Sequence, residues 1–212
     1  MPESYTLIIM LVLLSIGLAP AALDDYDDRL VDDRMWFFLL LPYAYLIYSS
    51  YMGFINLSDI LEGLILLPII IIPLVIIRKV GGLIGSADYI MYALISPFST
   101  YLHIPVAGIS WIPGVLIFII LTCILGIVYS VSKCIIKNRR LLKDSLKVNL
   151  IDFIKMLYSY KTSNPDNNKE IILSKIDDNK YIVTPGIPLI TMGLISLIIL
   201  LIINLLINYL IL

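Results

Sequence analysis

Two aspartates are the residues of this chain best placed to do chemistry. Asp88 ends a turn of small residues, Gly85-Ser86-Ala87-Asp88, and Asp25 lies in an acid-rich segment from Asp24 to Asp33. Both border long apolar stretches, where an ionisable side chain is costly and by default marks a functional site. Two carboxylates a few Å apart share one proton, so the charged one activates water while the protonated one donates to a carbonyl oxygen. This pair of roles is the chemistry of peptide hydrolysis by two acids.

Each acidic feature also has a purely structural interpretation. Gly-x-x-Asp is a short pattern that is common in inter-helix turns, where the aspartate caps the following helix. The six aspartates between Asp24 and Asp33 can form a solvated turn in which Asp32 or Asp33 caps a second helix. However, six acids exceed what a cap requires, and the small Gly85 and Ala87 would let an extended substrate backbone approach Asp88 closely.

Membrane helices must position these aspartates. The 212 residues are 60% hydrophobic and 15% charged, whereas an ordinary soluble domain has about 45–50% apolar and about 25% charged residues. Since a spanning helix needs about 20 mostly apolar residues, the charge-free runs predict an all-α integral membrane protein with six transmembrane helices. A small cytoplasmic insertion separates helices five and six. The six predicted helices cover residues 5–23, 35–55, 60–77, 89–104, 112–131 and 187–212.

The predicted organisation has three parts. Residues 1–132 form a five-helix membrane region with both acidic loops, residues 133–184 form a cytoplasmic segment, and residues 185–212 form the sixth helix. Within the cytoplasmic segment, helical spacing of apolar residues from Leu142 to Leu157 predicts a basic amphipathic helix. The runs 171–174 and 181–184 predict a short hairpin. This segment is either a solvated tether or a part that grips substrate.

The basic residues predict the orientation of the six helices. All fifteen Lys and Arg residues fall in three loops on one side of the predicted membrane, namely 24–34, 78–88 and 133–184. The positive-inside rule places these loops in the cytoplasm and both termini outside. Asp25 and Asp88 are therefore expected at the same cytoplasmic face of a multi-pass cell-membrane protein.

Three motifs, in order along the chain, resemble those of one protein family. Asp25 is followed by Arg29 and Trp36 at the spacing seen after helix one in archaeal type IV prepilin and preflagellin peptidases, which are GxGD-type intramembrane aspartic proteases. Gly85-Ser86-Ala87-Asp88 resembles their Gly-x-Gly-Asp motif, and Val183 to Pro188 resembles the start of their last helix. The resemblance implies an aspartic endopeptidase that removes the short leader of type IV pilin-like or archaellin precursors at the cytoplasmic face.

Carried over by motif, the resemblance makes Asp25 and Asp88 the catalytic pair, with Gly85, Ala87 and Arg29 in support. A shift of the alignment by one residue would make Asp24 the first catalytic aspartate in place of Asp25. Two departures from the family are Ala87, where the motif has a second Gly, and Ile90, where members often carry Lys. The cysteine-containing methyltransferase region of bacterial members is missing, so we expect cleavage without N-methylation. No cofactor, metal or nucleic acid is implied; the expected partners are membrane-inserted precursors and the lipid bilayer.

Two other functions remain open at this stage. The acid-rich segment is also similar to the Asp-rich motif of Mg²⁺-dependent intramembrane prenyltransferases, in which carboxylates hold the metal on a diphosphate. A non-catalytic membrane subunit or a small transporter would instead use the aspartates to line a polar pathway. The prenyltransferase requires Mg²⁺, the protease is indifferent to chelators, and the subunit or transporter cleaves nothing.

Overall fold

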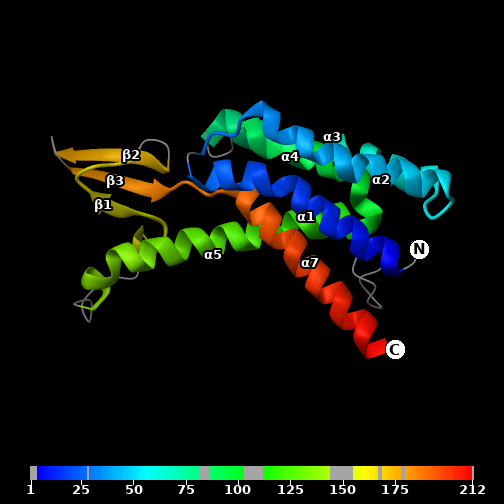
Figure 1. Cartoon of the computed structure of the whole chain (residues 1–212). Coiled ribbons are helices and arrows are strands. Elements are labelled where there is room, and N and C mark those ends of the chain that lie inside the picture. The colour runs from blue at the N-terminus through cyan, green and yellow to red at the C-terminus, as the bar shows by residue number, and fades with distance from the viewer. Residues whose placement is uncertain are drawn as a thin grey trace. The chain divides into compact units, whose positions relative to one another are not determined.

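The chain folds into two compact units, described here from a computed structural model (Figure 1). The helical unit comprises Met1–Cys123 with Leu189–Leu212, and the sheet unit comprises Ile124–Pro188. The last helix therefore lies in the same compact unit as residues 1–123. The structure describes residues 4–27, 29–81, 86–102, 112–143, 155–166, 169–177 and 180–211.

The described part of the helical unit consists of helices and the turns that join them. One long helix, α5 (Gly114–Lys143), begins in this unit and continues into the sheet unit. The 3-10 helices η1 and η2 each adjoin a short α-helix in the chain. The other elements are α1 (Ser4–Asp27), η1 (Asp33–Leu39), α2 (Leu40–Tyr51), α3 (Leu57–Gly81), α4 (Ser86–Ile95), η2 (Ser96–Leu102) and α7 (Leu189–Ile211).

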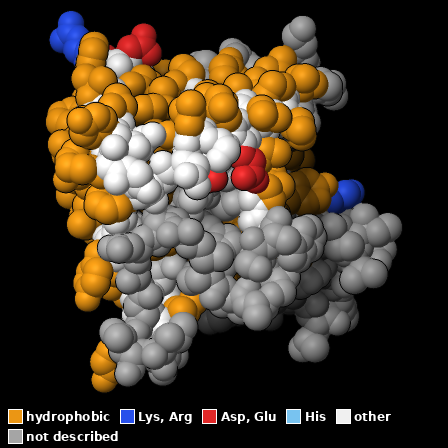
Figure 2. All heavy atoms as spheres, turned by 90° about the vertical axis from the view of Figure 1, so that its right-hand side faces the viewer, with side chains coloured by type: hydrophobic (Ala, Val, Ile, Leu, Met, Phe, Trp, Pro, Cys, Tyr) orange, Lys and Arg blue, Asp and Glu red, His pale blue; other side chains and the backbone are white. Residues whose placement is uncertain are grey.

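The core of the helical unit forms where α1 and α7 pack along each other. Leu11, Leu14 and Leu18 repeat at helical spacing on one face of α1 and are fully buried. Leu197 and Leu200 supply the matching face of α7. The opposite faces of these helices carry exposed apolar side chains, among them Ile16 of α1 and Ile202 of α7. In the view of Figure 2, most of the described side chains at the surface are hydrophobic. An exposed apolar surface of this extent is typical of helices that contact lipid.

Three helices among the described residues are long and apolar enough to cross a membrane. They are Tyr5–Asp27, Gly114–Arg139 and Leu189–Ile207. They correspond to the first, fifth and sixth predicted helices, so the membrane character predicted from composition is supported to this extent. Six spans are not supported.

Prolines explain why two of the predicted spans are shorter than expected. The predicted helix 35–55 is divided into η1 and α2 at Leu39, with Pro42 in the first turn of α2, where its missing N–H is tolerated. The predicted helix from Tyr89 ends as α4 at Ile95, because Pro97 disfavours the α-conformation at Ser96. The third predicted helix is present as α3 and extends beyond 60–77 at both ends.

The sheet unit contains three antiparallel strands, so the all-α prediction holds for the helical unit alone. They are β1 (Tyr160–Thr162), β2 (Glu170–Asp177) and β3 (Lys180–Pro185), in the order β1-β3-β2. The predicted hairpin is confirmed, with Ile171 opposite Thr184. Of the predicted amphipathic helix, α5 supplies the residues up to Lys143 and residues 155–158 are helical, while 144–154 lie outside the described residues.

One face of the sheet packs against α5. Cys134, Tyr160 and Val183 are buried together there. The Asn138 amide donates to the carbonyl oxygens of Met156 and Ser159, each at 2.8 Å. Burial raises the pKa of the Tyr160 hydroxyl, so this group stays protonated and donates to Glu170. The sheet is thereby fixed to the end of α5.

Candidate functional site: two buried aspartates

Asp25 is buried near the end of α1 and binds the beginning of α7. Its Oδ2 accepts hydrogen bonds from the backbone N–H groups of Ile190 (3.0 Å) and Thr191 (3.1 Å). The Thr191 hydroxyl lies 3.3 Å from the same oxygen and donates to the Ala22 carbonyl at 2.8 Å. The first and last helices of the chain are therefore joined by one carboxylate.

The sequence explains why α7 needs an acid from another helix. The first N–H groups of a helix have no partner within it and are usually capped by a side-chain oxygen just before the helix. Pro188 precedes Leu189 and has no such oxygen. Asp25 supplies it from α1, and its negative charge also suits the positive end of the α7 dipole. The geometry thus gives Asp25 a structural role in addition to any chemical one.

Arg29 shapes the other side of the Asp25 carboxylate. Its Nη1 lies 3.9 Å from Asp25 Oδ1 and donates to the Asp25 backbone carbonyl at 3.4 Å. Arg29 has a φ of 58°, a left-handed conformation that is uncommon for a residue other than glycine. This backbone reversal turns the chain after α1 so that the guanidinium group returns to Asp25. The predicted supporting role of Arg29 therefore has a geometric basis.

The neighbouring acids of the turn serve local structure. Asp24 Oδ2 accepts from the Asp32 N–H at 3.5 Å, and Asp32 caps η1 by accepting from the Arg34 N–H at 2.9 Å. The predicted cap at Asp32 is thereby confirmed. Asp24 is half-buried and Asp27, Asp32 and Asp33 are exposed, whereas Asp25 is only 6% exposed. Asp25 therefore differs from Asp24 in burial. In the sequence, only the spacing to Arg29 and Trp36 distinguished the two aspartates.

Asp88 is the second buried aspartate, with 8% exposure, in the first turn of α4. Ala87 packs against the main hydrophobic core, while Gly85 lies outside the described residues. Met91, one turn after Asp88, reaches α7 so closely that a Cβ on Gly193 would lie 2.7 Å from its sulfur. Helices α4 and α7 therefore meet within the first two turns of each.

Both aspartates consequently lie at one end of the helical unit. Figure 1 shows the end of α1 and the beginnings of α4 and α7 at the same end. Helix α7 contacts both α1 and α4. Thr191 completes this site but was not singled out from the sequence; its position three residues after Pro188, in the first turn of an apolar helix, is the signal that could have identified it. 

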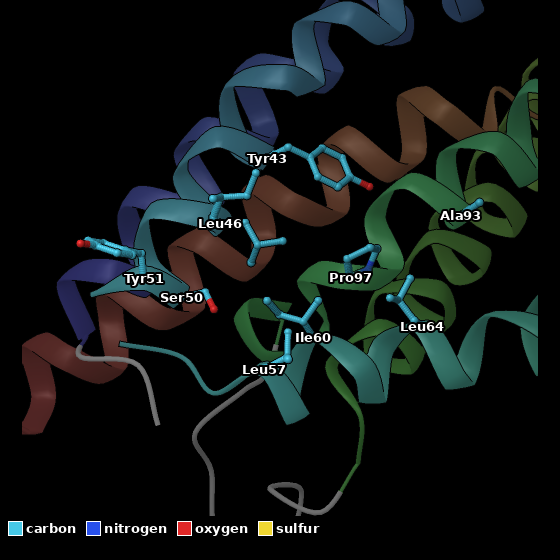
Figure 3. Close-up of a pocket in the computed structure, with 10 residues that line it drawn as sticks. Tyr43, Leu46, Ser50, Tyr51, Leu57, Ile60, Leu64, Ala93 and Pro97 are labelled. Carbon is cyan, nitrogen blue, oxygen red and sulfur yellow. The ribbon is translucent and has the colours of Figure 1, made fainter. Parts of the chain in front are cut away.

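An apolar groove lies further along the helical unit (Figure 3). It has a volume of about 630 Å³ and is lined by residues of α2, α3, α4 and η2, among them Tyr43, Leu46, Ile60 and Pro97. The Tyr43 hydroxyl donates to the Leu94 carbonyl at 2.7 Å and so ties α2 to α4. The lining includes Ala93, five residues along α4 from Asp88, a rise of about 7.5 Å.

The described part of the chain contains no group of three or more His, Cys, Asp or Glu side chains that could hold a metal ion. Comparisons with protein-family models, with curated proteins and with solved structures give no match. The three-motif resemblance therefore stays a prediction from sequence, and any functional conclusion depends on the geometry of the two aspartates.

Proposed function

We propose that the chain is a membrane-embedded aspartic endopeptidase that removes the short N-terminal leader of type IV pilin-like or archaellin precursors. The observation that carries the proposal is selective burial. Of the acidic side chains that the structure describes, Asp25 and Asp88 are the two that are buried. They are also the two that the motifs select. An ionisable group buried among apolar helices is costly and by default marks a functional site.

In the proposed mechanism Asp25 is the general base and Asp88 is the general acid. The backbone N–H groups of Ile190 and Thr191 occupy Oδ2 of Asp25. Oδ1 is left to accept a proton from water when Asp25 acts as the charged member of the pair. A protonated Asp88 donates to the carbonyl oxygen of the scissile peptide bond as the water oxygen bonds to its carbon. The proton taken by Asp25 then passes to the leaving nitrogen as the C–N bond breaks, and one hydroxyl of the tetrahedral intermediate returns a proton to Asp88 as the new carboxyl group forms. The two acids titrate as a pair, and both must reach one water molecule in the complex with substrate.

In this proposal the protein spans the cell membrane several times. The shorter elements η1–α2 and α4–η2, together with α3, complete the membrane part beside the three long apolar helices. The loops that carry Lys and Arg face the cytoplasm and both termini lie outside. The precursor is inserted in the same membrane, and its backbone must unwind near Asp88, because a helical peptide bond is protected by its own hydrogen bonds.

Cleavage of a leader-bearing pilin-like peptide by the detergent-solubilised chain tests the proposal, with products identified by mass spectrometry. We expect Asp25→Asn and Asp88→Asn each to abolish cleavage, because either change removes one member of the acid pair. Asp24→Asn is the matched control and should cleave normally, since among the described residues Asp24 accepts a hydrogen bond from the Asp32 N–H of the neighbouring turn.

Three outcomes would contradict the proposal in different ways. Full activity of Asp88→Asn would end the protease assignment. Inactivation by Asp24→Asn, with normal activity of Asp25→Asn, would shift the catalytic position by one residue. Absence of cleavage by the unaltered chain, together with Mg²⁺-dependent transfer of a prenyl group, would identify the metal-dependent enzyme instead.

A further inference from the structure

The sheet unit carries a basic pocket that none of the proposed chemistry uses. Lys161, Thr162 and Ser163 at the end of β1, Ile176 of β2 and Lys180 of β3 line a hollow of about 310 Å³. Two ammonium groups and two hydroxyls are donors that suit a phosphate group. The same pocket contains one large apolar side chain, which a site for a free anion does not need.

The strand register explains how these residues come together. Lys161 pairs with Ile182, so Lys161, Lys180 and Ile182 share one face of the sheet, opposite the face on which Val183 packs against Cys134. A break in register between Lys175 and Asp177 leaves Ile176 outside the strand pairing. The pocket is therefore on the face turned away from α5.

The edge strand β2 carries three exposed aliphatic side chains. Ile172, Leu173 and Ile176 are each between 42% and 49% exposed, and the second break in register lies at Leu173. Bulges often protect an edge strand from pairing with another chain. Here both bulges carry exposed aliphatic side chains. A surface that has an apolar layer next to a charged layer would suit them as a partner.

Chain connections keep this sheet close to a membrane boundary. The apolar span in α5 ends at Arg139, and the side chain of Asn138 holds the Ser159 carbonyl immediately before β1. At the other end, β3 stops at Pro185 and the next apolar span begins at Leu189. Four residues reach at most about 14 Å.

The charge of the sheet unit fits an anionic membrane. Ile124–Pro188 contains eleven Lys and Arg against six Asp and Glu, a net charge of +5 in a chain whose total is −1. We propose that the sheet docks on an anionic lipid leaflet, with a lipid phosphate between Lys161 and Lys180 and with Ile176 in the interface. Basic residues beside aliphatic ones are the usual composition of such interfacial surfaces. The proposal requires a membrane location but does not depend on protease activity.

Hydrogen exchange of the full chain in nanodiscs, one chain per disc, tests this proposal. Discs of phosphatidylcholine alone are compared with discs that also contain phosphatidylglycerol, and exchange is followed by mass spectrometry in peptides from β2. We expect slower exchange at 172–177 in the anionic discs. A lysine near an anionic surface contributes about fivefold to binding. Lys161→Glu with Lys180→Glu should therefore lower the equilibrium constant for docking by about 25-fold or more and reduce the slowing.

The matched control is Lys155→Glu with Lys169→Glu, which changes the charge equally outside the pocket and should retain most of the slowing. Ile176→Ser should reduce the slowing of exchange in the anionic discs. Unchanged exchange of β3 in neutral discs would show that the sheet of this variant remains folded. Equal exchange in both kinds of disc would overturn the proposal. Equal loss of the slowing in the control would show that general charge attraction, and not the phosphate pocket, holds the sheet at the membrane. Protection of β2 only at chain concentrations that permit dimers would show that a second copy of the chain, and not lipid, covers this strand.

Discussion

Asp25 has a structural and a proposed chemical role, and two substitutions should separate them. Asp25→Ala removes the oxygen that accepts from the Ile190 and Thr191 N–H groups. Loss of a helix N-cap costs about 0.5–2 kcal/mol. Two N–H donors lose their acceptor here, one of them in a buried hydrogen bond, and this places the cost near the upper value, about 2 kcal/mol. For a unit of this size 1 kcal/mol shifts Tm by about 2–4 °C, so we expect a fall of about 4–8 °C.

Asp25→Asn keeps an oxygen that can accept from the same two N–H groups but cannot take a proton from water. We expect it to unfold within about 1 kcal/mol of the unaltered chain and to lose cleavage as completely as Asp25→Ala. Thermal unfolding at one scan rate in one detergent and cleavage of a pilin-like peptide measure the two effects on the same samples. Asp24→Ala is the control and should change the stability by less than about 0.5 kcal/mol. Normal cleavage by Asp25→Asn would refute the chemical role, and an Asp25→Ala protein as stable as Asp24→Ala would refute the capping role.

Three further predictions concern the rest of the helical unit. Gly63→Ala should lower the free energy of unfolding by about 1–3 kcal/mol, because its Cβ would lie 2.0 Å from the Ser96 carbonyl oxygen. Gly193→Ala is the control and should have a smaller effect, since its Cβ meets the flexible end of the Met91 side chain. Equal shifts in Tm for the two variants would contradict this reasoning. Thr191→Val should cost about 1 kcal/mol through the lost hydrogen bond to the Ala22 carbonyl while cleavage persists, and Thr191→Ser should restore the stability. Chelation by EDTA should leave cleavage unchanged; loss of cleavage that Mg²⁺ restores would point to a metal-dependent enzyme.

Local patterns in the sequence predicted the elements that depend on local forces. The apolar run of α1, the Asp32 cap and the pairing of β2 with β3 each arise from residues close together in the chain, and the structure contains all three. Strand β1 has only three residues, too few for a pattern, and its pairing with β3 depends on a contact between distant segments.

The errors in the predicted spans have a similar origin. Hydrophobic length suggested a continuous helix across Pro42 and a fourth span that continues to residue 104 although Pro97 interrupts it. In the structure the backbone restrictions of proline divide the first of these helices and end the second. The sequence motifs selected Asp25 and Asp88, and the structure buries both of them. The hydrogen bonds from the N-terminus of α7 to Asp25 could not be predicted from local sequence patterns. Their donors, Ile190 and Thr191, follow Asp25 by 165 and 166 positions in the chain.

The junction between Asp25 and α7 also bears on how the protein is made. During synthesis α1 leaves the ribosome long before α7, so Asp25 has neither the Ile190 nor the Thr191 N–H group until the final helix has been inserted. A truncated or half-translated chain would hold a carboxylate that water or a chaperone must shield. The hydrogen bonds between Asp25 and α7 can therefore form only after Ile190 and Thr191 have been made. If the proposed function holds, this order would keep nascent chains inactive toward other proteins in the bilayer.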